Sequence, residues 1–257
     1  MRATANPLPL SGVVIAFNEA DRIRRCVASL VPLCSEVLVL DSGSTDDTAA
    51  IASEAGARVV QQPWLGFSAQ KNAAIAMATQ PWVLLLDADE WLDERAPDAI
   101  RLLFETGRID TADVWRLHLR THFLGTVLSH GGRGREPVDR MFRADVRYRD
   151  ALVHEALALS GKRIGTVRAR IEHDTARSEA HYAAKLQRYA ELWAQQRHAE
   201  GRRASAISAP LHALANWLKN YLFRGGFLDG GQAWRFHQLH ARYVHQKYRL
   251  LHASRTA

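Results

Sequence analysis

The stretch that decides the fold is Trp82-Val83-Leu84-Leu85-Leu86-Asp87-Ala88-Asp89-Glu90. Five consecutive apolar residues predict a strand that is buried on both faces, and the acidic run that follows ends it. Strands of this kind are typical of parallel sheets covered by helices on both sides. The acids then lie at the carboxyl end of the strand, which is the edge where such sheets bind ligands.

Working outward, the same kind of short apolar run occurs three more times before this stretch. The predicted strands are residues 12–16, 36–40, 57–60 and 82–86. Between them we expect helices over 20–30, over a segment capped by Ser44 or Thr45, and over 68–77, capped by Ser68. A strand–helix alternation with short connections predicts an α/β fold, a mostly parallel sheet flanked by helices.

The second half of the chain changes character. Residues 113–120 and 140–149 are predicted strands around a Gly-rich loop at 130–134. After about residue 176, apolar residues recur at helical spacing in two segments, one starting near Pro210 and one ending the chain. We expect a catalytic domain over 1–175, with a donor half at about 10–110 and an acceptor half at about 111–175, and a basic helical extension over 176–257.

The 257-residue chain has the composition of an ordinary globular protein, with 47% hydrophobic and 24% charged residues. Its net charge of +7 is concentrated in residues 176–257, which hold 13 Lys and Arg against 4 Asp and Glu. This asymmetry favours an anionic partner, either a membrane surface or a nucleic acid. Cys26 and Cys34 are too few for a disulfide framework, and we expect buried thiols in a reducing compartment.

The acids of Asp87-Ala88-Asp89 form the first candidate site. Carboxylate oxygens suit Mg²⁺ or Mn²⁺, and Mg²⁺ usually takes one or two protein carboxylates together with substrate phosphates. An ion held here would offset the charge of a diphosphate leaving group. Because an Asp-x-Asp also occurs in solvated turns, the position directly after a buried strand is what favours a metal site.

Asp41 begins the second candidate, Asp41-Ser42-Gly43-Ser44-Thr45-Asp46, at the end of the strand 36–40. A carboxylate at a strand end can accept a hydrogen bond from a nucleobase N–H. A helix cap accounts for residues 44–47 but not for Asp41, which needs a partner if it is buried. Because Asp41 and Asp87 both follow strands of one parallel sheet, we expect them at the same edge.

Four segments in this order resemble the family 2 glycosyltransferases, whose nucleotide-binding half has the GT-A fold. They are Asn18-Glu19, Asp41 to Asp46, Gln70-Lys71-Asn72 and Asp87 to Glu90. Further motifs resemble the subgroup of lipopolysaccharide-core β-1,4-glucosyltransferases and extend the resemblance over nearly the whole chain. They are Phe123-Leu124-Gly125, His130-Gly131-Gly132, Arg140 to Arg143, Val153-His154-Glu155 and Arg224 to Gly230.

The resemblance implies an inverting transferase that moves a hexose, expected to be glucose from UDP-glucose, to a lipid-linked glycan such as the lipopolysaccharide inner core. On the donor side it implies Asn18 and Glu19 near the nucleotide, Asp41 on the base, Lys71 near the nucleotide-sugar, and Asp87 facing the ribose or the metal. It places Asp89 on a Mg²⁺ or Mn²⁺ ion, with His154 as a further candidate ligand. Glu155 is the expected general base, a role that contributes roughly 10²–10⁴-fold to the rate.

One stretch departs from the subgroup pattern. Where the subgroup has Trp-Tyr-Pro-Asp after the paired glycines, this chain has Arg133-Gly134-Arg135-Glu136. Glu136 keeps an acid at the position of the family aspartate and is the second candidate for the base. The loss of the aromatic residues leaves the acceptor open, and the two arginines would suit a phosphorylated or carboxylated acceptor.

Two other functions compete with glycosyl transfer. A nucleotidyltransferase on a similar core would need a Gly-rich, basic phosphate loop after the first strand, where Phe17-Asn18-Glu19 stands instead. A non-catalytic anion- or nucleic-acid-binding protein is favoured only by the basic tail. Because the sequence has no helix-turn-helix, zinc-finger or RNA-binding signature, we expect no nucleic-acid partner.

The basic tail fits packing on the catalytic domain, contact with an anionic membrane, or a homodimer through its apolar stripes. Aromatic residues and basic residues both favour the membrane interface, where each basic residue contributes about 1 kcal/mol. The residues concerned are Trp217, Tyr221, Phe223 and Trp234 with Lys219, Arg224 and Arg235. No uncharged apolar run approaches the ~20 residues of a membrane-crossing helix. We expect a cytoplasmic protein, peripheral on the inner face of the cytoplasmic membrane.

The assignment of the base gives a first test. We expect Glu155→Gln to leave binding of the nucleotide-sugar intact and to stop turnover, because the amide cannot accept a proton from the acceptor hydroxyl. Calorimetry of donor binding and a rate assay on the same preparation measure the two effects. A near-normal rate in this variant would remove Glu155 from the mechanism and leave Glu136 as the candidate.

Overall fold

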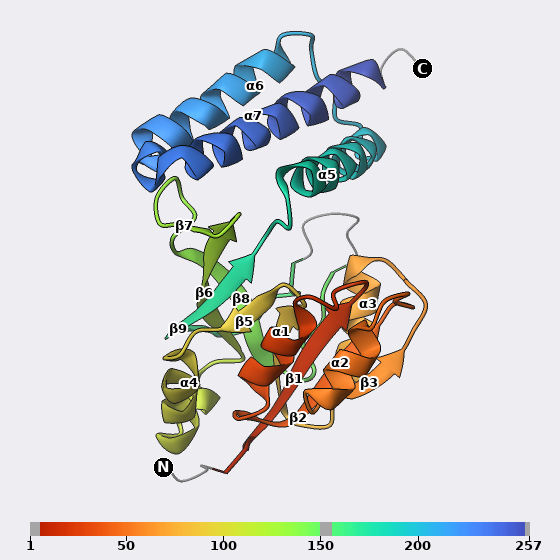
Figure 1. Cartoon of the computed structure of the whole chain (residues 1–257), viewed down its shortest axis with the longest axis vertical. Helices are drawn as coiled ribbons and strands as arrows, with labels where there is room; N and C mark the ends of the chain where they lie inside the picture. The colour runs from red at the N-terminus through yellow and green to blue at the C-terminus, as the bar shows by residue number, and fades with distance from the viewer. Residues whose placement is uncertain (1–5, 150–155, 255–257) are drawn as a thin grey trace. The chain divides into compact units, whose positions relative to one another are not determined.

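The computed structural model describes residues 6–149 and 156–254 (Figure 1). The chain divides into two compact units. Among the described residues, the first consists of 6–119, 137–149 and 156–173, and the second of 120–136 and 174–254. That residues 176–257 serve as an extension of a catalytic domain stays a prediction.

The first unit opens with the predicted alternation of strands and helices. The strands are β1 (Leu8–Ala16), β2 (Cys34–Asp41), β3 (Arg58–Gln61) and β4 (Trp82–Asp87), and the helices are α1 (Ile23–Leu30), α2 (Thr48–Glu54) and α3 (Phe67–Ala76). The four strands are parallel and lie in the order β3-β2-β1-β4. The predicted α/β arrangement is therefore confirmed.

The central strands are buried because successive side chains of a strand point to opposite faces and both faces are covered. Val14 of β1 and Leu84 of β4 pack in one apolar cluster with Val27 of α1. Val13 and the neighbouring odd-numbered residues of β4 pack in a second cluster with Ile75 of α3. Continuous apolar runs in the sequence thus correspond to strands between two helical layers.

Antiparallel strands extend this sheet on the β4 side. Among the described residues, the sheet has nine strands in the order β3-β2-β1-β4-β8-β6-β9-β5, with β7 paired to β6. The added elements are β5 (Glu90–Leu92), α4 (Ala96–Glu105), a 3₁₀ turn (Arg108–Thr111), β6 (Val114–Phe123), β7 (Thr126–Leu128), β8 (Glu136–Arg143) and β9 (Ile164–Asp174). The pairing of β5 with β9 sets Glu90 opposite His173.

Two local predictions were wrong. The strand expected at 140–149 is β8, which ends at Arg143 because its partner β4 begins at Trp82 and offers no residue beyond that pair. Ser68 does not cap α3: the helix begins at Phe67 after Gly66, and Ser68 is buried inside its first turn.

The expected cap of α2 was also wrong. Neither Ser44 nor Thr45 caps this helix, which begins at Thr48 after Asp47. The Asp46 carboxylate instead accepts the Thr48 N–H at 3.1 Å. Ser44 and Thr45 both form hydrogen bonds with Asn18.

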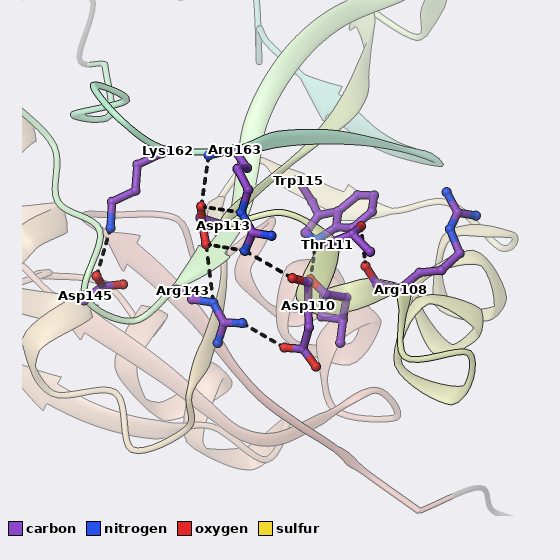
Figure 2. A network of polar contacts seen from close by, with 10 residues as sticks. Arg108, Asp110, Thr111, Asp113, Trp115, Arg143, Asp145, Lys162 and Arg163 are labelled. Carbon is purple, nitrogen blue, oxygen red and sulfur yellow. Dashed lines mark hydrogen bonds and ion pairs between the residues drawn. The ribbon is translucent and has the colours of Figure 1, made fainter.

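Figure 2 shows a polar network at one end of strands β6, β8 and β9. Asp113, just before β6, accepts hydrogen bonds from the backbone N–H of Arg163 at 2.9 Å and from its guanidinium group. Arg143 bridges Asp110 at 2.8 Å and Asp113 at 3.7 Å. These bonds from Arg163 lower the pKa of Asp113 to about 2. The network ties the ends of these three strands together.

The second unit is helical. It contains α5 (Glu179–Ala199), α6 (Ser208–Trp217), a π-helical turn η2 (Leu218–Phe223), a 3₁₀ turn η3 (Gly226–Asp229) and α7 (Gly230–Ala253). Both α5 and α6 pack against α7, and Phe236 of α7 joins Tyr182 of α5 and Phe123 in an aromatic core. The two helices expected after Pro210 are thus confirmed. Among the helices of the described residues, none combines the length and apolar content of a membrane crossing.

Close packing around Trp115 gives a stability test. A Cβ on Gly165 would lie 2.6 Å from the Trp115 ring, which is buried with its Nε1 donating to the Ile109 carbonyl at 3.1 Å (Figure 2). We expect Gly165→Ala to lower the free energy of unfolding by about 1–3 kcal/mol. Denaturant unfolding followed by tryptophan fluorescence measures the loss.

Gly231 is the matched control, because a Cβ there meets no atom within 4 Å. We expect Gly231→Ala to change the stability by less than about 0.5 kcal/mol. Equal unfolding midpoints for the two variants would show that the Trp115 site yields without strain.

Candidate active site

The two strand-end acids lie at one edge of the parallel sheet, on either side of β1. Asp41 at the end of β2 pairs with Ala16, and Asp87 at the end of β4 pairs with Ile15. The expectation that these acids share an edge is therefore confirmed. Short loops from neighbouring strands meet at this edge, and the ligand-binding position of such sheets lies just outside it.

The loops after β1 and β2 are tied to each other through Asn18. Its carboxamide oxygen accepts the Thr45 N–H at 2.8 Å, and its own N–H donates to the Ser44 hydroxyl at 2.9 Å. Asn18 has φ 54°, a left-handed conformation that asparagine tolerates better than most residues. The next N–H, that of Glu19, donates to the Thr48 hydroxyl at 2.8 Å. Asn18 and Glu19 thus shape the edge of the sheet.

Asp41 is fully buried, and its carboxylate is used by its own loop. It accepts the N–H groups of Gly43 at 3.1 Å and Ser44 at 2.9 Å, and the Ser44 hydroxyl. These bonds supply the partner that a buried carboxylate needs. They account for Asp41 as the residue that builds the loop, and the contact with a nucleobase stays a prediction.

Asp87 belongs to a cluster of four charged side chains. Its carboxylate lies 3.2 Å from Lys71 Nζ of α3 and 2.8 Å from Arg140 Nη2 of β8. The same Arg140 nitrogen lies 2.6 Å from Glu90 Oε1, while Glu90 Oε2 accepts the Asp87 N–H at 3.0 Å. Lys71 and Glu90 are buried, Arg140 is 12% exposed and Asp87 is 34% exposed. Each buried charge thus has an opposite charge beside it.

The cluster pushes the pKa values of its two acids apart. Burial raises the pKa of Glu90, and the Arg140 charge offsets only part of that rise. Burial also disfavours the charge on Asp87, but Lys71 and Arg140 outweigh it and hold its pKa well below the ordinary value. Asp87 is therefore the firmly ionised member of the pair at neutral pH.

Asp89 lies beside this cluster, directly before β5, but meets different partners. Its Oδ2 atom is 3.4 Å from His173 Nε2 and 3.7 Å from Arg22 Nη1. His173 comes from β9, which the pairing of β5 and β9 brings alongside. A carboxylate and an imidazole at this distance can share one divalent ion, since both are ordinary metal ligands.

The donor set at this edge fits an ion that is completed by its substrate. Within residues 6–149 and 156–254, no three His, Cys, Asp or Glu side chains gather as a full metal cage. Asp89 offers one carboxylate, and Mg²⁺ usually combines one or two carboxylates with phosphates and water. His173 adds a nitrogen ligand beside it. Asp87, by contrast, is already held by two cations.

The candidates for the base lie elsewhere. Glu155 and His154 fall outside the described residues, so their roles stay predictions. Glu136 is described in the second unit, where its carboxylate forms an ion pair with Arg133 at 3.0 Å. It is 43% exposed, as a base that receives a proton from an incoming acceptor must be accessible.

The chain is similar to proteins of one known family. The sequence model described as "Glycosyl transferase family 2" matches residues 11–142, about half of the chain. The chain belongs to this family. The match includes Asn18, Asp41, Lys71, Asp87 and Asp89.

Curated relatives extend the similarity. An uncharacterized glycosyltransferase of Rickettsia felis is 40% identical over 110 residues, which cover 43% of this chain and 39% of that protein. The match thus spans about two fifths of the length of such relatives. The lipopolysaccharide core biosynthesis glycosyltransferase LpsC of Rhizobium meliloti is 29% identical and covers 95% of this chain and 94% of its own.

Solved structures are similar over parts of the chain. Glucosyl-3-phosphoglycerate synthase from Mycobacterium tuberculosis, in complex with Mn²⁺, UDP-glucose and phosphoglyceric acid, is 28% identical over 43% of each chain, with a TM-score of 0.36. A second mycobacterial protein is 22% identical over 72% of this chain and 73% of its own, with a TM-score of 0.46. With the family established, the predicted GT-A architecture with its C-terminal helices is confirmed.

In this family 2 chain, the glycine motifs of the second unit contact each other. Asp229 accepts the His130 backbone N–H at 2.7 Å and lies 2.6 Å from its ring Nδ1. Both Gly131 and Gly226 face the buried His237, whose Nε2 lies 2.5 Å from where a Cβ would stand on either. Burial lowers the pKa of His237 to about 4, so it packs as a neutral ring. These contacts give Gly131 and Gly226 a packing role, because a side chain on either would collide with His237.

Three residues of the site were missed at the level of sequence. His173 stood as a lone histidine, Arg140 as part of a motif without a role, and Glu90 as the last acid of an acidic run. The available signal was Arg140 itself, which stands directly before the apolar pair Met141-Phe142. A charge within a strand that pairs with β4 must find a partner.

Both cysteines are buried free thiols, as expected.

The buried cluster predicts a pH-dependent stability. We expect Arg140→Met to lower the free energy of unfolding by about 3–5 kcal/mol at pH 7, because it leaves ionised Glu90 buried without a cation. Since the folded-state pKa of Glu90 is raised, protonation at acid pH removes that penalty, and the loss should shrink as the pH falls. Asp87 keeps Lys71 throughout.

Arg116→Met is the matched control, since Arg116 pairs with Asp139 at 2.8 Å on the partly exposed side of β6 and β8. We expect it to cost less than about 1 kcal/mol with no dependence on acid pH. Denaturant unfolding of both variants at pH 7 and pH 5 makes the comparison. Equal losses for the two arginines would contradict the role given to Arg140.

Proposed function

We propose that this chain is a hexosyltransferase that moves glucose from UDP-glucose to a lipid-linked glycan acceptor and uses Mg²⁺ or Mn²⁺. The observation that carries the proposal is the pairing of Asp89 with His173 at 3.4 Å, beside Lys71 and Asp87, at the sheet edge where α/β folds bind ligands. Membership of family 2 supports glycosyl transfer, and the similarity to LpsC supports a core glycan acceptor.

The residues at the edge divide the work of donor binding. The loop held by Asn18 and Asp41 would seat the uridine, with Glu19 beside it. Lys71, buried against Asp87, would direct its ammonium group toward the donor phosphates. It would also hold the Asp87 carboxylate in place to face the ribose. Such positioning holds the anomeric carbon in place for attack and reduces the entropy lost on reaching the transition state.

Asp89 and His173 are the proposed metal ligands, and His154 stays a candidate from the sequence. When bound, the ion would supply positive charge that stabilises the leaving diphosphate. Arg22, 3.7 Å from Asp89, would keep that carboxylate oriented. M. tuberculosis glucosyl-3-phosphoglycerate synthase has been crystallised with Mn²⁺ and with Mg²⁺, together with UDP.

For the acceptor, an inverting reaction needs one carboxylate to take the proton of the attacking hydroxyl. Glu155 is the proposed base and Glu136 the second candidate. Arg133 and Arg135, which replace the aromatic residues of the subgroup, support a phosphorylated or carboxylated acceptor. We further propose that the protein works at the inner face of the cytoplasmic membrane, where a lipid-linked acceptor is found, and that residues 1–175 form the catalytic domain.

The donor site is tested by calorimetry with a panel of nucleotide diphosphate sugars, with and without Mn²⁺. We expect selective, metal-dependent binding of UDP-glucose. Asp89→Ala should abolish the metal-dependent part, because it removes the proposed carboxylate ligand. His173→Ala should weaken it by at least about tenfold, because a direct ligand contributes no less than the residues that orient ligands.

His118→Ala is the matched control, since His118 is another strand histidine of the first unit that lies on β6. We expect donor binding unchanged in this variant. Binding that ignores Mn²⁺ in the native protein, or that survives Asp89→Ala, would reject the metal site. Steep salt-dependent binding of nucleic acid without sugar turnover would instead favour the non-catalytic alternative.

A further inference from the structure

The outer face of α6 carries a stripe of exposed apolar side chains. Ile207 is 69% exposed, Leu211 and Leu214 are each 57% exposed, and the stripe continues on η2 with Leu222 at 47% and Phe223 at 79%. The spacing of three and four residues places the first three on one side of the helix. In the second unit α6 packs on α7, and the stripe stays exposed beside that contact, with Leu214 at its border. Contiguous apolar surface of this kind marks an interaction site.

This face differs from the aromatic group expected from the sequence. Trp217 and Tyr221 stack at 4.9 Å between ring centres, and Trp234 meets their edges at 5.6 and 5.1 Å. These rings pack on one another and hold η2 against α7, while Trp234 stays 40% exposed. The stripe carries more strongly exposed side chains, among them Phe223 of the expected group at 79% and Ile207 at 69%.

A groove of about 500 Å³ runs beside the stripe between α6 and α7. Leu214 and Trp217 line its α6 wall, and Arg242, His245 and Arg249 line its α7 wall. These three side chains follow one side of α7, because they are three and four residues apart. Within the described part of the chain, no carboxylate forms an ion pair with them. An apolar wall thus faces a basic wall across one groove.

The surrounding charge is strongly one-sided. Residues 208–253 contain six Lys and Arg and a single acid, Asp229. That acid is engaged by His130 at 2.6 Å. The face therefore complements an anionic partner that also offers apolar material, which describes a phospholipid bilayer with acidic headgroups.

We propose that the α6–α7 face, made of the leucine stripe and the basic groove, docks this protein on an anionic phospholipid bilayer. Leu211 and Leu214 enter the boundary between headgroups and acyl chains, while Arg242 and Arg249 contact headgroup phosphates. Leu214 belongs to both the stripe and the groove, so the two contacts act on the same surface. The inference does not depend on the proposed transferase reaction, because it concerns the second unit alone.

Two other partners fit this face less well. A second copy of the chain would bring the same uncompensated arginines together across a two-fold interface, where like charges repel. A nucleic acid would use the cations but leave most of the stripe in water, since Ile207, Leu211, Leu214 and Leu222 are aliphatic and cannot stack on bases as an aromatic ring such as Phe223 can.

The test is co-sedimentation of the full chain with vesicles of phosphatidylcholine alone and of phosphatidylcholine with 30% phosphatidylglycerol. We expect binding only to the anionic vesicles, weakened by high salt. The double variant Arg242→Gln/Arg249→Gln should lose roughly 30-fold in partition coefficient, as each basic residue near such a surface contributes about a factor of five. The double variant Leu211→Ser/Leu214→Ser should lose at least about tenfold.

Matched controls come from the first unit. Leu102→Ser changes a leucine of α4 that is 54% exposed, and Arg95→Gln/Arg168→Gln removes two exposed charges. Both should bind vesicles as the native chain does. The proposal is overturned if the native chain ignores anionic vesicles, if the controls lose as much as the α6–α7 variants, or if Leu211→Ser/Leu214→Ser abolishes a dimer without changing vesicle binding.

Discussion

The candidate site depends on one buried constraint, the placement of the Arg140 guanidinium between Asp87 and Glu90. Burying a guanidinium and two carboxylates is unfavourable unless the charges meet directly, and here one nitrogen lies 2.8 and 2.6 Å from the two acids. The ion pair of Arg140 with Asp87 joins β8 to the end of β4. It therefore also fixes the acidic segment, residues 87–90, that follows β4. With Asp87 held by Arg140 and Lys71, the polypeptide turns so that Asp89 faces His173 instead.

This arrangement gives different roles to Asp87 and Asp89, two acids that the sequence alone does not distinguish. Asp87 is neutralised by protein cations and acts as an organiser of the edge, whereas Asp89 keeps a histidine beside it and suits a metal ion. The contrast comes from the elements that each acid contacts. Asp87 contacts α3 and β8, whereas Asp89 contacts β9. The same logic applies to Asp41, whose carboxylate is satisfied by the N–H groups of its own loop.

Much of the first unit could be predicted because its information is local. The apolar runs of β1, β2 and β4 require burial on both faces, and the helices between them follow from their spacing. The later strands were harder: β5 and β7 have three residues each, which is too short for a pattern. In β9 the alternation of apolar and charged residues is a strand signal that was overlooked. The helix caps were missed because Gly66 and the Asn18 contacts replaced the expected hydroxyl caps.

The sequence by itself determined the family, the α/β core and the presence of acids at the carboxyl ends of two strands, because strand burial and order along the chain are encoded in neighbouring residues. Only the tertiary structure decided which acid meets which cation, that His173 lies opposite Glu90, and that the tail presents leucines while its tryptophans pack together. Those contacts join residues 17 to 83 positions apart, and no local pattern specifies them. The polar contacts follow from strand pairing and from the need of each buried charge for a partner.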